Sequence, residues 1–99
     1  MTTLHLLSRS PFVDGSLNSC LRLLAAGDGV LLTGDAVYAL QANAAPWVAL
    51  SQLSDKVPLF ALLEDVEARA IAVPERVQLV DYVAFVALTL TFSKVNSWL

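Results

Sequence analysis

The sequence predicts an α/β fold: a three-layer sandwich in which a small parallel sheet of about four strands is flanked by helices. Four short apolar runs recur along the chain, and helical patterns fall between them. The runs alternate little between apolar and polar residues, which is typical of strands covered on both faces. Strands that alternate with helices form a parallel sheet through right-handed crossovers. Because 99 residues suffice for one core but not two, we treat 1–99 as a single domain.

The predicted strands lie at 4–7, 30–33, 57–62 and 77–80. Proline lacks a backbone N–H, so Pro58 indicates that the third strand begins there or lies near an edge. His5, within the first strand, is the sole histidine. A lone strand histidine is more often a hydrogen-bonded core residue than a base or a ligand, and a zinc site is improbable without a second histidine or a cysteine nearby.

The first predicted helix starts at Ser16, where leucines and a cysteine recur at three- and four-residue spacing. Asp14 or Ser16 could cap its start, and Gly27 could end it. Further helices are predicted from Asp35 to Gln41, from Glu64 to Ala70 and, opened by Pro46 and Trp47, within 43–56.

Asp81 is predicted to cap a last helix, in which Val83, Val86 and Leu90 share one side. Valine, phenylalanine and threonine dominate this segment, and these residues favour strands intrinsically. The cap and the continuous length of the segment nevertheless favour a helix.

The composition is unusually apolar for so short a chain. Hydrophobic residues make up 57% and charged residues 15%, against about 45–50% and about 25% in ordinary soluble domains. A spanning helix needs about 20 nearly uninterrupted apolar residues, and the most apolar stretch, 77–92, contains Gln78 and Asp81. Residues 1–5 lack the features of a secretory signal. We therefore expect the apolar excess to be buried against a protein partner and not in a membrane.

The charged residues and the single cysteine argue against further classes of protein. The net charge is −3, and the six basic residues are scattered, whereas direct nucleic-acid binding needs a clustered basic surface. One cysteine cannot form an internal disulfide, which suits a reducing compartment such as the cytoplasm. No glycine-rich phosphate loop is present, and we expect no cofactor and no metal.

Acidic residues follow several strands, where ligands gather in open parallel sheets. Asp35, Glu64, Asp65 and Asp81 could form a cation site, as in a metal-dependent phospho-acceptor domain built on Asp35. The interpretation that we favour is that each acid caps the helix it precedes. A phospho-acceptor domain would also need a lysine after a late strand, and no lysine is placed that way.

Cys20 is the candidate catalytic residue, because it is the only possible sulfur nucleophile. It could carry a persulfide, helped by the start of its helix. The alternative is a buried packing role, since it shares an apolar face with leucines. Trp47 and Trp98 are candidate interface anchors, although the tail that holds Trp98 could instead fold back over its own sheet.

Several short motifs together resemble one family. They are Leu4-His5, Ser10-Pro11-Phe12, Asp35 with Val37-Tyr38-Ala39, Asp65 with Ala68-Arg69, Val80-Asp81-Tyr82 with Phe85-Val86 and Leu88-Thr89, and Ser97-Trp98. In this order and at this chain length, they resemble the TusB/DsrH family of sulfur-relay proteins. Two departures are Ala36 and Ala70, which stand where the family often has glycine. The segment 41–56 carries little family signal.

The resemblance implies a DsrE/F/H-like fold and assembly with two paralogous subunits, TusC/TusD-like or DsrF/DsrE-like, commonly as a heterohexamer. Such a complex receives persulfide sulfur from a TusA-like protein and passes it towards a TusE/DsrC-like protein, for 2-thiouridine at the tRNA wobble position. The related Dsr complex serves sulfur oxidation. The principal sulfur-carrying cysteine lies on the TusD-like subunit, although DsrH-type members have a cysteine where Cys20 stands. We therefore expect an accessory subunit, not an enzyme on its own, with Cys20 as a direct carrier in the alternative.

Overall fold

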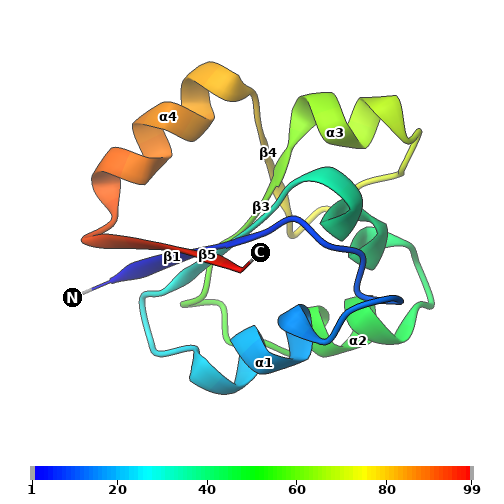
Figure 1. The fold of residues 1–99 in the computed structure, drawn as a ribbon, viewed down its shortest axis with the longest axis horizontal. Helices are drawn as coiled ribbons and strands as arrows, with labels where there is room; N and C mark the ends of the chain where they lie inside the picture. Colours follow the sequence, from blue (N-terminus) through cyan, green and yellow to red (C-terminus); the bar gives the residue numbers. More distant parts are fainter. Residues whose placement is uncertain (1, 99) are drawn as a thin grey trace.

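A fully parallel sheet of five strands forms the centre of the protein (Figure 1), which we describe for residues 2–98 from a computed structural model. The strands are β1 (Thr3–Leu7), β2 (Gly29–Leu32), β3 (Leu59–Leu62), β4 (Gln78–Val80) and β5 (Lys94–Trp98). Their spatial order is β4-β3-β2-β1-β5. The predicted α/β class and its parallel sheet are confirmed. The four predicted strands are present, and the sheet has one strand more than predicted.

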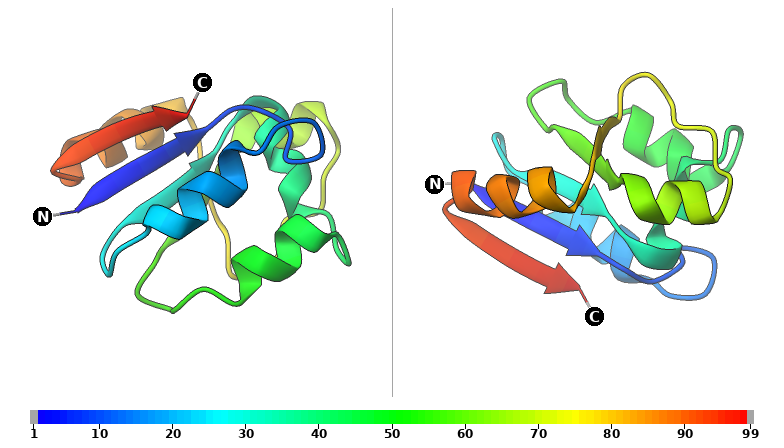
Figure 2. Two further views of the ribbon diagram at one scale, coloured as in Figure 1. Left: turned by 60° about the horizontal axis from the view of Figure 1, so that its bottom comes forward. Right: turned by 90° about the horizontal axis from the view of Figure 1, so that it is seen from above.

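The additional strand is the chain's tail. β5 pairs in parallel with β1 over its whole length, from Thr3 opposite Lys94 to Leu7 opposite Trp98. Figure 2 shows β5 and β1 side by side at the edge of the sheet. Of the two outcomes left open for Trp98, the structure has the tail folded onto its own sheet, where its ring packs against the core and is only partly buried.

Helices connect the strands where the sequence predicts them. They are α1 (Ser16–Leu23), the 3₁₀ helix η1 (Gly34–Leu40), α2 (Ala45–Ser51), α3 (Leu63–Ala68) and α4 (Tyr82–Thr91). α1 ends at Leu23, before the expected stop at Gly27, whose φ of 91° lies in the turn that follows. The N-cap of α1 is Gly15, and the Asp14 carboxylate accepts a hydrogen bond from the Ser16 backbone N–H at 2.7 Å.

Side chains alternate across the strands and build a core on each face of the sheet. On one face, β-strand residues such as Leu7, Val30 and Ala61 pack with residues of α1, η1 and α2. The other face is covered by α4, which contributes the side chains Phe85 and Leu88. The result is the predicted three-layer arrangement, with α1 and α2 on one side of the sheet and α4 on the other (Figure 1).

α4 crosses its face because it must carry the chain from β4, at one edge, to β5 at the other. Asp81 caps its start by accepting a hydrogen bond from the Ala84 N–H at 2.8 Å, as predicted. At the far end Phe92 lies so close to β2 that a Cβ on Gly29 would come within 2.8 Å of its ring. Among residues 2–98, no helix is long and apolar enough to cross a membrane.

Candidate functional site

The carboxyl ends of the strands surround a pocket of about 310 Å³, the position at which open parallel sheets bind ligands. Its wall combines hydroxyl and carboxylate groups with apolar and aromatic side chains. The residues that line it are Leu6, Ser8, Thr33, Gly34, Leu62, Asp65, Tyr82, Phe85 and Ser97. One of them, Asp65, is among the acidic residues that the sequence predicts at the ends of the strands.

The backbone around this pocket is held by hydrogen bonds between neighbouring strand ends. The Thr33 N–H and hydroxyl both donate to the Leu7 carbonyl, at 2.8 and 3.0 Å. Gly34 follows with a φ of 50°, and a Cβ there would lie 3.2 Å from the Ser8 carbonyl oxygen. Glycine is therefore favoured both by the left-handed backbone and by the close approach of the β1 end.

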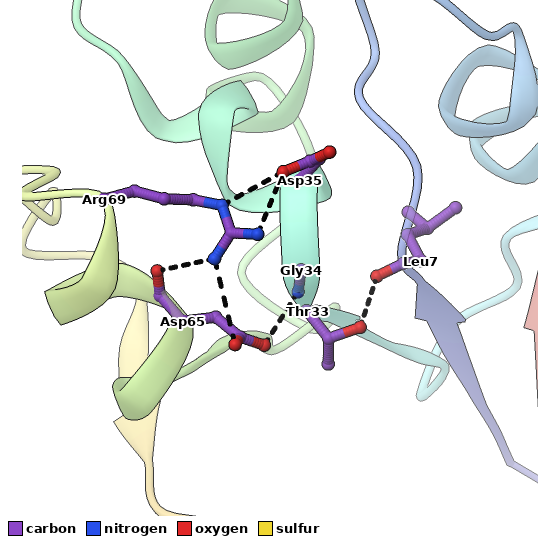
Figure 3. A network of polar contacts seen from close by, with 6 residues as sticks. All are labelled: Leu7, Thr33, Gly34, Asp35, Asp65 and Arg69. Carbon is purple, nitrogen blue, oxygen red and sulfur yellow. Dashed lines mark hydrogen bonds and ion pairs between the residues drawn. The ribbon is translucent and has the colours of Figure 1, made fainter.

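Arg69 joins the two acidic residues at this edge (Figure 3). Its Nε and one terminal nitrogen donate to Asp35 Oδ1 at 3.1 and 2.9 Å, and the other nitrogen donates to the Asp65 backbone carbonyl at 3.2 Å. The guanidinium also lies over the Tyr38 ring, 5.9 Å from its centroid. The hydrogen bond to Asp35 raises the pKa of Arg69 above its ordinary value. Arg69 thus ties η1 to α3.

The prediction that each acid caps the helix it precedes is right for Asp81 and wrong for Glu64, Asp35 and Asp65, which lie inside the helices that they were predicted to cap. Neither of the latter two accepts a capping bond from its own helix. Asp65 instead accepts the Gly34 N–H at 2.7 Å and so caps η1 from the neighbouring helix (Figure 3). Arg69 takes the place between them that a cation would need. Within residues 2–98, no group of three or more histidine, cysteine or acidic side chains is arranged to hold a metal.

Cys20 lies elsewhere, in the middle of α1 and fully buried in the core beneath it. Burial, and after it the negative charge of Asp28, raises the pKa of the Cys20 thiol to about 12. Since the thiolate is the nucleophile, the buried thiol is not poised for attack in this conformation. Within the part of the chain that the structure describes, Cys20 does not line the pocket at the strand ends.

A second polar cluster surrounds His5, which is buried in β1. The Trp98 indole N–H donates to His5 Nδ1 at 3.1 Å, and His5 Nε2 lies 3.4 Å from Asp28 Oδ2. The Asp28 carboxylate also accepts the backbone N–H groups of Thr3 and Ala25, at 2.9 and 3.0 Å. His5 is therefore the hydrogen-bonded core residue that the sequence predicts. Asp28 was not predicted, because a turn aspartate between two glycines gives no local sign of a buried role.

The outer side of α4 is apolar and open to solvent. Val83 is 81% exposed and Leu90 82%, and Tyr82 and Val86 are exposed on the same helix. None of the ten described residues of α4 is buried, and the segment contains no charged residue. The predicted sharing of one side by Val83, Val86 and Leu90 is confirmed, and that side faces outward. The apolar excess of the sequence is thus gathered partly on one helix.

Comparison with known proteins places the chain in a family. Residues 9–95 match the family described as DsrH like protein. The chain belongs to the DsrH-like family. Its relatives include Protein TusB of Erwinia tasmaniensis, 40% identical over 97 residues, which covers 96% of this chain and 99% of the relative. Protein TusB of Photorhabdus laumondii is 35% identical over 98 residues, with coverage of 96% and 99%.

The fold of this DsrH-like chain is also found among solved structures. The crystal structure of the ychN protein from E. coli superposes with a TM-score of 0.82, covering 99% of this chain and 100% of that one. The two sequences are 20% identical, so this likeness concerns the fold alone.

Ala70, one of the two positions at which the sequence departs from the TusB/DsrH family pattern, occupies a strained backbone conformation in this DsrH-like chain. It follows Arg69 at the end of α3 with a φ of 52°, in the left-handed region that glycine occupies without strain. The glycine usual in the family would suit this backbone better than alanine. The departure affects the turn and leaves the Arg69 contacts in place.

Proposed function

We propose that this chain is an accessory subunit of a heteromeric sulfurtransferase complex of the TusBCD/DsrEFH kind, which relays persulfide sulfur in the cytoplasm. The observation that carries the proposal is the similarity to proteins named TusB over 96% of the chain. Two paralogous subunits, TusC/TusD-like or DsrF/DsrE-like, complete a heterohexamer. The complex serves the formation of 2-thiouridine at the tRNA wobble position, receiving sulfur from a TusA-like protein and delivering it to a TusE/DsrC-like protein.

The state of Cys20 supports an accessory role over a direct one. A sulfur carrier must present a thiolate to the persulfide that it attacks. Cys20 is fully buried, and the pKa of its thiol is raised to about 12. The sulfur-carrying cysteine therefore lies on a partner subunit. The alternative, a Cys20 persulfide that serves sulfur oxidation, requires α1 to move away from the sheet before each transfer.

The exposed side of α4 supports the assembly. Leaving Val83 and Leu90 more than four-fifths exposed in a free chain forgoes the stabilisation of their burial, about 1.5–3 kcal/mol for a leucine or valine that passes from full exposure to full burial. An uncharged helix face of this kind is typical of the centre of a permanent interface. We therefore place a partner subunit on α4.

The interface is tested with Leu90→Glu, which puts a charge in the centre of the proposed contact. Leu90 is 82% exposed, so the substitution leaves the fold of the chain unaffected. Burying the charge against the partner should weaken assembly by about 100-fold or more. Leu23→Glu on α1 is the matched control, because Leu23 is 62% exposed and lies in the opposite layer. Pull-down from co-expressing cells reads out both variants. Full recovery of the partners by Leu90→Glu contradicts the placement on α4.

The function is tested by complementation. A bacterium that lacks its own TusB protein receives this chain together with the two proposed paralogous subunits, and its tRNA is digested for mass spectrometry of 2-thiouridine. We expect the modification to return, and to return equally with Cys20→Ala in place of the native residue. Complexes that assemble normally without restoring 2-thiouridine contradict the tRNA role. Restoration that depends on Cys20, with assembly intact, favours the direct carrier.

A further inference from the structure

The hydrogen bonds around His5 assign its tautomer. The Trp98 indole N–H can only donate, so His5 Nδ1, 3.1 Å away, must accept and carry no proton. The proton of the neutral ring therefore sits on Nε2, which points at Asp28 Oδ2 at 3.4 Å. The ring thus bridges a tryptophan in β5 and an aspartate in the turn before β2, two segments far apart in the sequence.

Protonation of the ring affects its two partners in opposite ways. A charged imidazole has an N–H at both nitrogens. The Nε2–H still donates to Asp28, and the added positive charge strengthens this contact. The new Nδ1–H, however, faces the indole N–H of Trp98, and two donors cannot share a hydrogen bond. Adding one proton therefore removes the bond to β5 and keeps the bond to Asp28.

The surroundings of the ring leave Asp28 as its charged partner. Burial acts to raise the pKa of Asp28, but hydrogen bonds from Thr3, Ala25 and His5 outweigh burial, and the pKa lies below its usual value. From α1, the Cys20 thiol is within electrostatic reach of this carboxylate and stays neutral, since its pKa is raised to about 12. From β5, the residue in register with His5 is the uncharged Asn96.

The strand that this bridge holds, β5, is an exposed edge strand of the sheet. Four of the five β5 residues are exposed, and only Trp98 at its end is partly buried. The Trp98 ring packs against the core and lies 6.2 Å from the His5 ring between centroids. Side-chain anchoring of β5 to the body of the protein is therefore concentrated at Trp98.

We propose that His5 is a proton-sensitive latch for the carboxyl-terminal strand: the neutral ring holds Trp98 through Nδ1, and protonation of Nδ1 releases it. The latch acts on the end of β5. Its release loosens the sheet edge beside β1 and leaves the remaining strands, including the turn that holds Asp28, in place.

The test follows the ring and the indole in one sample. The chain has one histidine and two tryptophans, so selective ¹⁵N labelling of the full chain gives few signals, and Trp47 serves as the internal reference. We expect the neutral ring to be the Nε2–H tautomer. As pH falls, the exchange rate of the Trp98 indole proton with solvent should rise roughly fivefold or more relative to the rate of the Trp47 indole proton. A rise of this size corresponds to the loss of one hydrogen bond. The midpoint of this rise must coincide with that of the His5 titration.

The variant His5→Gln is the matched control. Glutamine carries one acceptor and one donor about as far apart as the two ring nitrogens, and it does not titrate. We expect the Trp98 indole of this variant to show no step with pH. A wild-type indole that is unchanged while the ring gains its proton overturns the latch, as does an Nδ1–H tautomer of the neutral ring or the same step in His5→Gln. If glutamine does not fit the core, the comparison of Trp98 with Trp47 in the wild-type protein still tests the latch.

Discussion

The buried thiol of Cys20 allows a quantitative prediction of how the stability of the protein depends on pH. Its pKa is raised from 9.0 to about 12 in the folded chain, mainly by burial and then by the charge of Asp28. The unfolded chain therefore loses this proton at lower pH than the folded one. The stability that the buried, protonated thiol contributes is fully present below pH 9.0 and is lost as pH rises towards about 12. At about pH 10.5 the loss amounts to about 2 kcal/mol, since each unit of pKa difference corresponds to about 1.4 kcal/mol.

The assay compares the wild type with Cys20→Ala by urea unfolding at pH 8 and at pH 10.5. Removing the sulfur from a packed site costs about 1–2 kcal/mol at pH 8. Between the two pH values, the stability of the wild type relative to the variant should fall by about 2 kcal/mol. The two proteins differ in no other ionisable group, so the remaining pH dependence cancels. A difference that does not change with pH refutes the reasoning.

Alkylation gives an independent reading of the same thiol. At pH 8, a thiol with a pKa of about 12 is thiolate in about one molecule in ten thousand, so the folded chain should react about a thousandfold more slowly than the unfolded one. Alkylation of the folded chain at the rate of an exposed cysteine would show that α1 opens readily. That result would support Cys20 as a direct carrier of sulfur.

Two further variants test local features of the fold by urea unfolding. Arg76 donates to carbonyls at the end of α2 and just beyond it, among them Leu53 O at 2.7 Å, so Arg76→Ala should destabilise the protein by about 2–4 kcal/mol. The control Arg22→Ala, at an exposed position, should change stability by no more than about 0.5 kcal/mol. Equal effects of the two substitutions would contradict the capping role of Arg76. Ala70→Gly should stabilise by about 0.5–1 kcal/mol, because it relieves a φ of 52°. The control Ala68→Gly, at the last residue of α3, should destabilise by up to a similar amount. A loss of stability in Ala70→Gly would show that the turn is not strained.

Local sequence patterns predicted the elements that local physics decides. The first four strands are apolar runs, and α4 begins at an aspartate that caps it. β5 has no such pattern, because Lys94, Asn96 and Ser97 are polar and the segment is exposed. Its strand conformation depends on pairing with β1, at the other end of the chain. No window of neighbouring residues contains that information.

The polar clusters show the same limit. Asp35, Asp65 and Asp81 look alike locally, since each stands at the start of a helix, yet only Asp81 caps its own. Arg69, 34 residues after Asp35, binds it and decides its role. The bridge from Trp98 to His5 spans 93 residues. The family resemblance covered these positions, but their contacts became visible only in the fold.

The central claim is that this chain works as a subunit among paralogues. The most direct measurement is native mass spectrometry of the chain co-expressed with the proteins encoded beside it and purified without crosslinking. We expect a heteromer that contains this 10.6 kDa chain and two other subunits of similar size, in equal copies. A chain that emerges as a stable monomer or homo-oligomer, with both other proteins present but unbound, would contradict the account.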